Sequence, residues 1–148
     1  MKTNTNGAID DIAENMVRVG LLLRKKLLKF DCETLDISPP HFFILMALNE
    51  SGALPVSVIG RSAAISKPEM TRFTDKLEAL GLVERIPDAE DRRVINLALT
   101  KKGKQVLAEA RKLIRDNAKV RLSSLEPGEL EKLAVSLKSL SGIISKIE

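Results

Sequence analysis

The sequence contains no tyrosine, no tryptophan, a single histidine (His41) and a single cysteine (Cys32). One cysteine excludes an intramolecular disulfide, so we expect a protein of the reducing cytoplasm. A zinc site built from histidine and cysteine needs about four ligands, and these two residues cannot supply them. The chain also lacks a glycine-rich nucleotide-binding motif and the strand-turn-helix that surrounds a catalytic serine. We therefore expect neither an enzyme nor a bound metal or cofactor.

Long apolar runs are missing as well. The run from Leu21 to Leu28 is interrupted by three basic residues at 24–26, and a bilayer span needs ~20 apolar residues. Residues 1–11 lack the basic start and the apolar stretch of a signal peptide. We expect no association with a membrane.

Charge of both signs is present, with 24 Lys and Arg against 20 Asp and Glu, a net +4. The basic residues gather at 18–30 and at 101–121, whereas residues 52–100 carry equal numbers of each sign. Solvated helix surfaces explain such clusters as well as a polyanionic partner does. The charge count by itself therefore favours a nucleic-acid partner only modestly.

Apolar residues recur every three or four positions over most of the chain, which predicts helices. Long helices are expected over 9–30, 101–122 and from Pro127 to Ile147, with shorter ones over 41–49 and 56–64. Residues 51–55 are predicted to be a turn, and Gly60 lies in the middle of a short helix, where glycine costs ~1 kcal/mol relative to alanine. The apolar stripes of the end helices are wider than a small central module covers, so we expect a second copy to cover them.

The central segment has the signals of a winged helix. Ser66 and Glu69 form a capping box that starts a helix, and Gly81 ends it. Period-two alternation over 82–86 and 94–99 then predicts a β-hairpin, with Ile95, Leu97 and Leu99 on one side, joined by the polar loop 88–93. In such modules the second helix enters the major groove of DNA, and the hairpin reaches the backbone or the minor groove.

Residues 65–103 resemble the MarR family of bacterial and archaeal transcriptional regulators. The resemblance is carried by Gly-Leu-Val-Glu-Arg at 81–85, Asp-Arg-Arg at 91–93 and Leu-Thr-x-x-Gly at 99–103. It implies a mainly α fold with a small β-hairpin wing. Residues 37–100 would form the winged helix-turn-helix domain, flanked by dimerisation helices in 1–36 and 101–148. It further implies a homodimer that binds a pseudo-palindromic operator in double-stranded DNA, most often as a repressor. A small aromatic or phenolic effector would relieve the repression.

The resemblance and the residue types together name candidate site residues. Arginine pairs bidentately with guanine, and serine and threonine donate to phosphates or bases. The expected DNA contacts are Ser66, Lys67, Pro68, Thr71, Arg72 and Lys76 on the helix and Asp91, Arg92 and Arg93 on the wing, where Asp91 would orient the following arginine. An effector cleft would be bordered by Arg18, His41, Phe42 and Met46.

Other readings of these residues stay open. The cations of the helix are compatible with surface charges that pair with Asp75 and Glu78. The wing arginines are compatible with a loop kept soluble by charge, or with local pairing to Asp88 and Asp91. Phe42 and Met46 are compatible with plain core, and His41 with a local hydrogen bond. A winged-helix protein-interaction module without sequence-specific DNA binding is therefore the alternative function. Some family members sense oxidants through a cysteine, but the acidic neighbours of Cys32 disfavour a thiolate, so we expect it to be inert.

Overall fold

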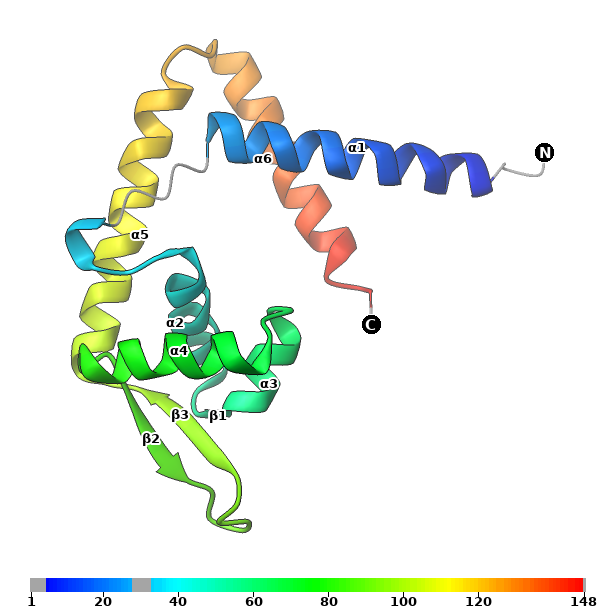
Figure 1. Ribbon diagram of the computed structural model, residues 1–148. Coiled ribbons are helices and arrows are strands. Elements are labelled where there is room, and N and C mark those ends of the chain that lie inside the picture. The colour runs from blue at the N-terminus through cyan, green and yellow to red at the C-terminus, as the bar shows by residue number, and fades with distance from the viewer. Residues whose placement is uncertain (1–4, 28–32, 148) are drawn as a thin grey trace. The chain divides into compact units, whose positions relative to one another are not determined.

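The computed structural model describes residues 5–27 and 33–147 and divides into two units. Residues 30–114 form the winged-helix unit, and residues 1–29 together with 115–148 form the helical unit. Helix α5 (Lys101–Leu122) belongs to both, because the division falls between Ile114 and Arg115 (Figure 1).

Within the described residues, the winged-helix unit contains three strands, three whole helices, a 3-10 turn and the first part of α5. In chain order they are the short 3-10 turn η1 (Glu33–Leu35), α2 (Pro39–Ser51), β1 (Leu54–Pro55), α3 (Val56–Ser62), α4 (Lys67–Ala79), β2 (Val83–Pro87), β3 (Ile95–Leu99) and the first part of α5. The strands form an antiparallel sheet in the order β1-β3-β2. The hairpin of β2 and β3 projects away from the helices (Figure 1). This arrangement confirms the predicted winged helix-turn-helix.

Local sequence signals explain where the helices of this unit start and stop. Ser38 precedes α2 and Ser66 precedes α4, and each is followed by proline in the first helical turn. The Ser66 backbone N–H donates to Glu69 Oε2 over 3.3 Å, which is the predicted capping box. Gly81, with φ +71°, turns the chain from α4 into β2.

One apolar core holds the winged-helix unit together. It draws side chains from α2, α3, α4, β3 and α5. Those at most 2% exposed include Ile44, Leu45, Ile59, Leu77, Leu97 and Leu107. Helix α4 is thus fixed on its inner face, which leaves its outer face to solvent.

Several sequence predictions differ from the structure in detail. Residues 54–55 are a short strand rather than part of a turn, because they pair with β3 opposite Leu97 and Asn96. Ile95 is 38% exposed although Leu97 on the same side of the strand is buried, since Ile95 lies further out along the wing. Helix α3 ends at Ser62 and α6 (Pro127–Ile144) ends before Ile147. Helix α1 (Thr5–Lys26) starts earlier than predicted, and the predicted end at 28–30 lies outside the described residues.

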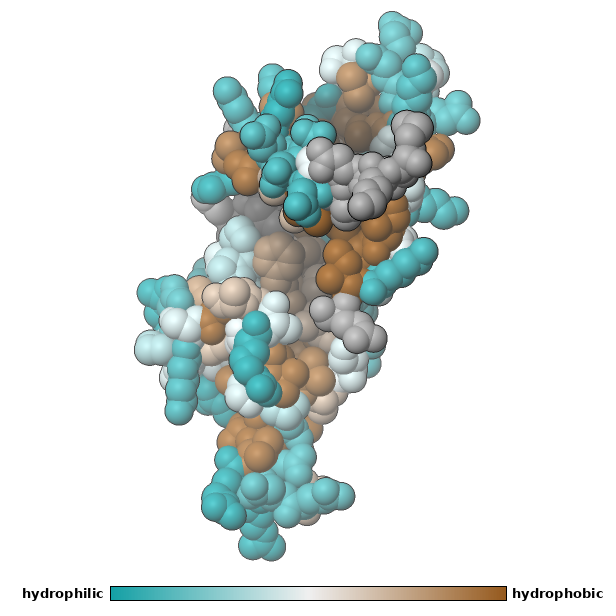
Figure 2. Space-filling model, turned by 90° about the vertical axis from the view of Figure 1, so that its right-hand side faces the viewer, coloured by the Kyte–Doolittle hydropathy of each residue, from teal (hydrophilic) through white to brown (hydrophobic). Residues whose placement is uncertain are grey.

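The helical unit consists of α1, the end of α5 and α6. None of its described residues is buried. Large hydrophobic side chains along α1 and α6 stay open to solvent, for example Met16 at 64% and Ile143 at 59% exposure. Hydrophobic residues also reach the surface in Figure 2. Within the described residues, no helix is both long and apolar enough to cross a membrane.

Candidate nucleic-acid interface

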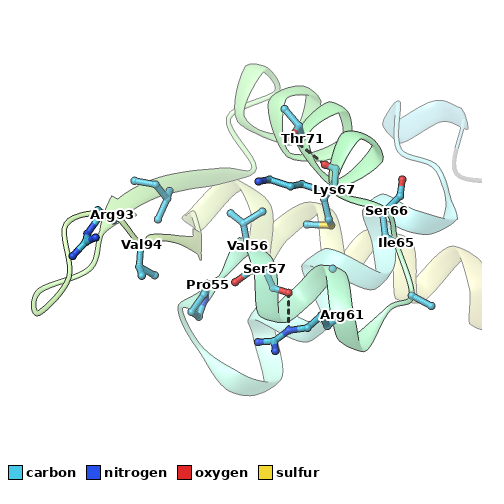
Figure 3. A pocket seen from close by; sticks show the side chains of 14 residues that line it. Pro55, Val56, Ser57, Arg61, Ile65, Ser66, Lys67, Thr71, Arg93 and Val94 are labelled. Atoms are coloured by element: carbon cyan, nitrogen blue, oxygen red, sulfur yellow. Dashed lines mark hydrogen bonds between the residues drawn. The ribbon is translucent and has the colours of Figure 1, made fainter.

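The first turns of α4 border a cleft of about 750 Å³ whose other walls are α3 and the outer part of the wing, where β3 begins (Figure 3). Four of the predicted DNA-contacting residues line it: Ser66, Lys67, Thr71 and Arg93. The Lys67 side chain extends from α4 toward the wing (Figure 3). Residues far apart in the sequence therefore border a single concave surface.

The sequence analysis missed Arg61, which lines the same cleft from α3. Its Nε donates to the backbone carbonyl of Ser57 over 3.4 Å, so the side chain lies along its own helix (Figure 3). The signal in the sequence is a cation in the last turn of the first helix of the motif. This cation adds positive charge on the side of the cleft opposite Lys67.

On the outer face of α4, Thr71 and Arg72 have defined local contacts. The Thr71 hydroxyl donates to the Lys67 carbonyl over 3.1 Å, so it faces a ligand as a hydrogen-bond acceptor. The Arg72 guanidinium lies 5.2 Å from the centroid of the Phe73 ring, which is a cation–π distance.

Lys76 is the last of the six DNA contacts predicted for this helix, and it forms an ion pair with a residue outside the helix. Its Nζ lies 2.6 Å from Oδ1 of Asp36, which precedes α2 and has φ +52°. The local pairing considered for the helix cations is not what the structure shows, because Asp75 and Glu78 both contact Arg85 of β2. That arginine ends the family motif at 81–85, and the sequence analysis gave it no role of its own.

Two aspartates organise the tip of the wing. Asp88 accepts hydrogen bonds from the backbone of Glu90 (2.9 Å) and Asp91 (3.1 Å) and from Asn96 Nδ2 (3.0 Å). These hydrogen bonds lower the pKa of the Asp88 carboxyl, and the bond donated by the Asp91 backbone N–H has the largest effect. Asp91 in turn accepts the backbone N–H of Arg93 over 3.0 Å and lies 3.4 Å from its Nε. Asp91 therefore contacts Arg93 and not Arg92, the arginine that directly follows it, and this is the local pairing that the sequence left open for the wing arginines.

Several acids of this unit have internal contacts. Asp75 and Glu78 contact Arg85. Glu69 accepts from Ser66, and this hydrogen bonding lowers the pKa of the Glu69 carboxyl. By contrast, Lys67 and Arg92 form no ion pair with any described residue. Among the described residues, the cations Lys67 and Arg92 are thus free to meet a polyanion.

The expected effector residues fall into two groups. His41, Phe42 and Met46 lie on α2, where Phe42 and Met46 pack against the core, whereas Arg18 belongs to α1 in the helical unit. The Arg111 guanidinium contacts the Met46 sulfur, with its Nη2 at 2.9 Å. Core packing thus describes the two apolar residues, and an effector cleft stays a prediction. Cys32 lies outside the described residues.

His41 is buried and has a local partner, as one of the two readings predicts. Its Nδ1 accepts the Ser38 backbone N–H over 3.0 Å and the Ser38 hydroxyl over 2.7 Å. The ring stacks edge-on against Phe73, with centroids 5.2 Å apart. Burial first, and then the positive charge of Lys76, lower the pKa of His41 below its ordinary value. Nδ1 is an acceptor here, so the proton of the neutral ring is on Nε2.

In the part of the chain that the structure describes, no group of three or more His, Cys, Asp or Glu side chains is placed to hold a metal ion.

Comparisons with known proteins agree with this geometry. A model of the MarR family matches residues 37–95. The uncharacterized HTH-type transcriptional regulator YfiV of Bacillus subtilis is 30% identical over 141 residues, covering 95% of this chain and 78% of that protein. The HTH-type transcriptional repressor MdtR of the same organism is 36% identical over 71 residues, 48% of this chain and 46% of that one.

Solved structures give the same result for the fold. The transcriptional regulator BldR of Sulfolobus solfataricus superposes with a TM-score of 0.72 at 32% identity, and the match covers 94% of this chain and 98% of that one. The chain therefore belongs to the MarR family of transcriptional regulators, which are DNA-binding proteins and not enzymes.

Proposed function

We propose that this regulator is a repressor that binds a pseudo-palindromic operator as a homodimer and is released by a small aromatic or phenolic effector. The observation that carries the proposal is the cleft that α4 shares with the wing, where Lys67 and Arg93 line one surface. The helix would read bases in the major groove, and the wing would reach the adjacent minor groove or backbone. Repression would follow from occupying the promoter.

Within this proposal, Lys67, Thr71 and Arg72 contact base edges and Ser66 and Pro68 lie at the phosphate side of the helix start. Arg72 is suited to a bidentate contact with guanine. Lys76 reaches DNA only by giving up Asp36, which lies 2.6 Å away. On the wing, Arg92 and Arg93 supply the charge and Asp91 holds Arg93 in place.

The uncovered helical unit supports a homodimer. Its apolar side chains on α1 and α6 are exposed in a single chain, and burying apolar surface contributes about 25 cal/mol per Å². A second copy of the same chain covers such stripes with two-fold symmetry. Two symmetric recognition helices then require a pseudo-palindromic site. We expect Met16→Glu to yield monomers in analytical ultracentrifugation, whereas Asn15→Glu on the same helix serves as the control.

An effector is supported by the state of His41. Its Nε2 is buried and has no hydrogen-bond partner among the described residues, which is costly for a polar group. A carboxylate or phenol oxygen is an acceptor that would satisfy it. We expect benzoate, used as the probe, to weaken DNA binding by the wild type and to lose this effect in His41→Ala. Equal inhibition of both proteins would argue against a role for His41.

DNA binding is tested by fluorescence anisotropy of the purified protein with its own upstream duplex and with a scrambled duplex, over a series of salt concentrations. We expect a preference above ~10³ for the upstream duplex and a steep fall of affinity with salt. Arg72→Ala should cost roughly 1–3 kcal/mol and relax the preference, and Arg93→Ala should weaken binding to both duplexes. Arg115→Ala, on the exposed surface of α5, is the matched control and should bind as the wild type does.

Two outcomes would contradict the proposal. Equal affinity for the two duplexes would show that binding is not sequence-specific. Retention of a protein partner by a double charge reversal at Arg72 and Arg93, with no duplex bound by the wild type near physiological salt, would favour the protein-interaction module instead.

A further inference from the structure

Arg85 connects the wing to the recognition helix. It lies in the middle of β2, opposite Leu97 of β3. Its Nη1 donates to Glu78 Oε2 over 2.6 Å, and its Nη2 donates to Asp75 Oδ1 over 2.5 Å and to Thr74 Oγ1 over 3.1 Å. One guanidinium therefore contacts three side chains of α4.

The contacts of this cluster are mutually consistent. Thr74 is fully buried, and its hydroxyl donates to the Thr71 carbonyl over 3.0 Å, so its oxygen accepts from Arg85. The Arg85 side chain is 34% exposed, so its ion pairs are screened less than fully exposed ones. The planar fork of an arginine engages two carboxylates and a hydroxyl at once, which a lysine does not.

Two consequences follow for a winged helix on DNA. The helix and the wing enter neighbouring parts of the duplex, so their spacing must match the spacing of the grooves. The hairpin projects from the helices (Figure 1). The Arg85 side chain connects its first strand, β2, to the C-terminal half of α4. In addition, without Arg85 the helix would present the two negative charges of Asp75 and Glu78 toward a polyanion.

We propose that Arg85 is a positioning residue of the DNA interface. It fixes the wing relative to α4, so that both reach their grooves together, and it neutralises the carboxylates of Asp75 and Glu78. The inference rests on the proposed DNA-binding function, since it assigns to Arg85 the geometry on which sequence preference depends.

A set of variants separates geometry from charge. Asp75, Glu78 and Arg85 sum to one negative charge in the wild type, to two in Arg85→Met, and to none in the triple variant Asp75→Asn/Glu78→Gln/Arg85→Met. Arg85→Met should weaken binding to both duplexes through the added negative charge, and binding to the upstream duplex more, because the link between wing and helix is lost as well. The triple variant should restore scrambled-duplex affinity and the salt dependence to about wild-type values. Its preference for the upstream duplex should stay at least about ten-fold lower than that of the wild type.

Two further variants complete the set. Arg85→Lys keeps the charge but not the fork, and it should also lose preference while remaining folded. Arg115→Met removes an exposed arginine from α5 and should leave both affinities unchanged. Melting temperatures are measured for all variants, and binding is compared below the lowest of them. A triple variant or an Arg85→Lys protein with full wild-type preference would overturn the inference.

A second measurement needs no DNA and keeps the two proposals apart. Spin labels at Ala79→Cys on α4 and Glu90→Cys on the wing, in a Cys32→Ser background diluted with unlabelled protein, report the helix-to-wing distance by pulsed electron paramagnetic resonance. The distance distribution should broaden in the triple variant and stay narrow in Arg115→Met. An unchanged distribution in the triple variant would overturn the role of Arg85, whatever the DNA experiment gives. A wild type without duplex preference would refute the proposed function alone.

Discussion

The junction between the wing and α5 is packed so closely that one methyl group should destabilise the protein. Gly103 is buried in the first turn of α5. A Cβ at this position would lie 2.0 Å from the Leu82 carbonyl oxygen and 3.2 Å from Leu99 Cγ, where ordinary contact begins at 3.4 Å. The Leu82 oxygen accepts the Thr100 backbone N–H over 3.1 Å, so it cannot withdraw without losing this hydrogen bond.

The expected cost of Gly103→Ala follows from three contributions. Overpacking a buried site costs about 2 kcal/mol, and losing the hydrogen bond to Leu82 costs about 1 kcal/mol. The higher helix propensity of alanine returns about 1 kcal/mol. We therefore expect the free energy of unfolding to fall by about 2 kcal/mol, a large part of the stability of a small domain.

Urea denaturation followed by circular dichroism measures this change, and two glycines provide controls. In Gly60→Ala the nearest atom to the new Cβ is Met70 Cγ at 2.9 Å, which belongs to a flexible side chain, so we expect a change within about 1 kcal/mol. In Gly142→Ala nothing lies within 4 Å, and we expect stabilisation by up to about 1 kcal/mol. A Gly103→Ala protein with the urea midpoint of the wild type would refute the packing argument.

Three further predictions concern single residues. The pKa of His41 is lowered from its ordinary value of 6.5 by burial. The unfolded chain therefore takes up the proton first, and the free energy of unfolding should fall as the pH drops from 6.5 through the lower pKa of the folded state. Urea midpoints should depend less on pH in His41→Gln. Ala64 has φ +52°, so Ala64→Gly should raise the free energy of unfolding by up to about 1 kcal/mol. The melting temperature should rise accordingly. Asp88→Ala removes the acceptor of three hydrogen bonds at the wing tip, so DNA affinity should fall while the melting temperature changes little.

Each of these has a contrary result. Parallel pH profiles of the wild type and His41→Gln would remove His41 as the titrating group. A lower melting temperature in Ala64→Gly would mean that the flexibility of the unfolded chain outweighs the relief of backbone strain. Unchanged DNA affinity in Asp88→Ala would show that the tip does not contact the duplex.

Features that depend on neighbouring residues were predictable from the sequence. The start of α4 follows from Ser66 and Glu69, which are three residues apart, and its end from Gly81. The hairpin follows from alternation and a polar loop. These signals act over one or two turns of chain, and the structure has each of them.

Contacts between distant residues were not predictable in the same way. Lys76 pairs with Asp36, 40 residues away in the chain, and nothing local distinguishes it from a cation paired along its own helix. Strand β1 is a Leu-Pro dipeptide that is a strand only because β3 lies beside it. Arg61 and Arg85 gain their positions from the packing of α3 and β2 against α4, which periodicity does not specify.

The contrast between the two units has a consequence for how the protein melts. The winged-helix unit has its own core, whereas the helical unit buries none of its described residues. In the proposed homodimer, folding of α1 and α6 is one equilibrium with association, and its midpoint should move with protein concentration by mass action. Dilution should separate two transitions, a concentration-dependent loss of helix followed by a concentration-independent unfolding of the winged-helix unit. In the proposed homodimer, the number of regulator molecules in a cell would thus set the fraction of chains that are paired.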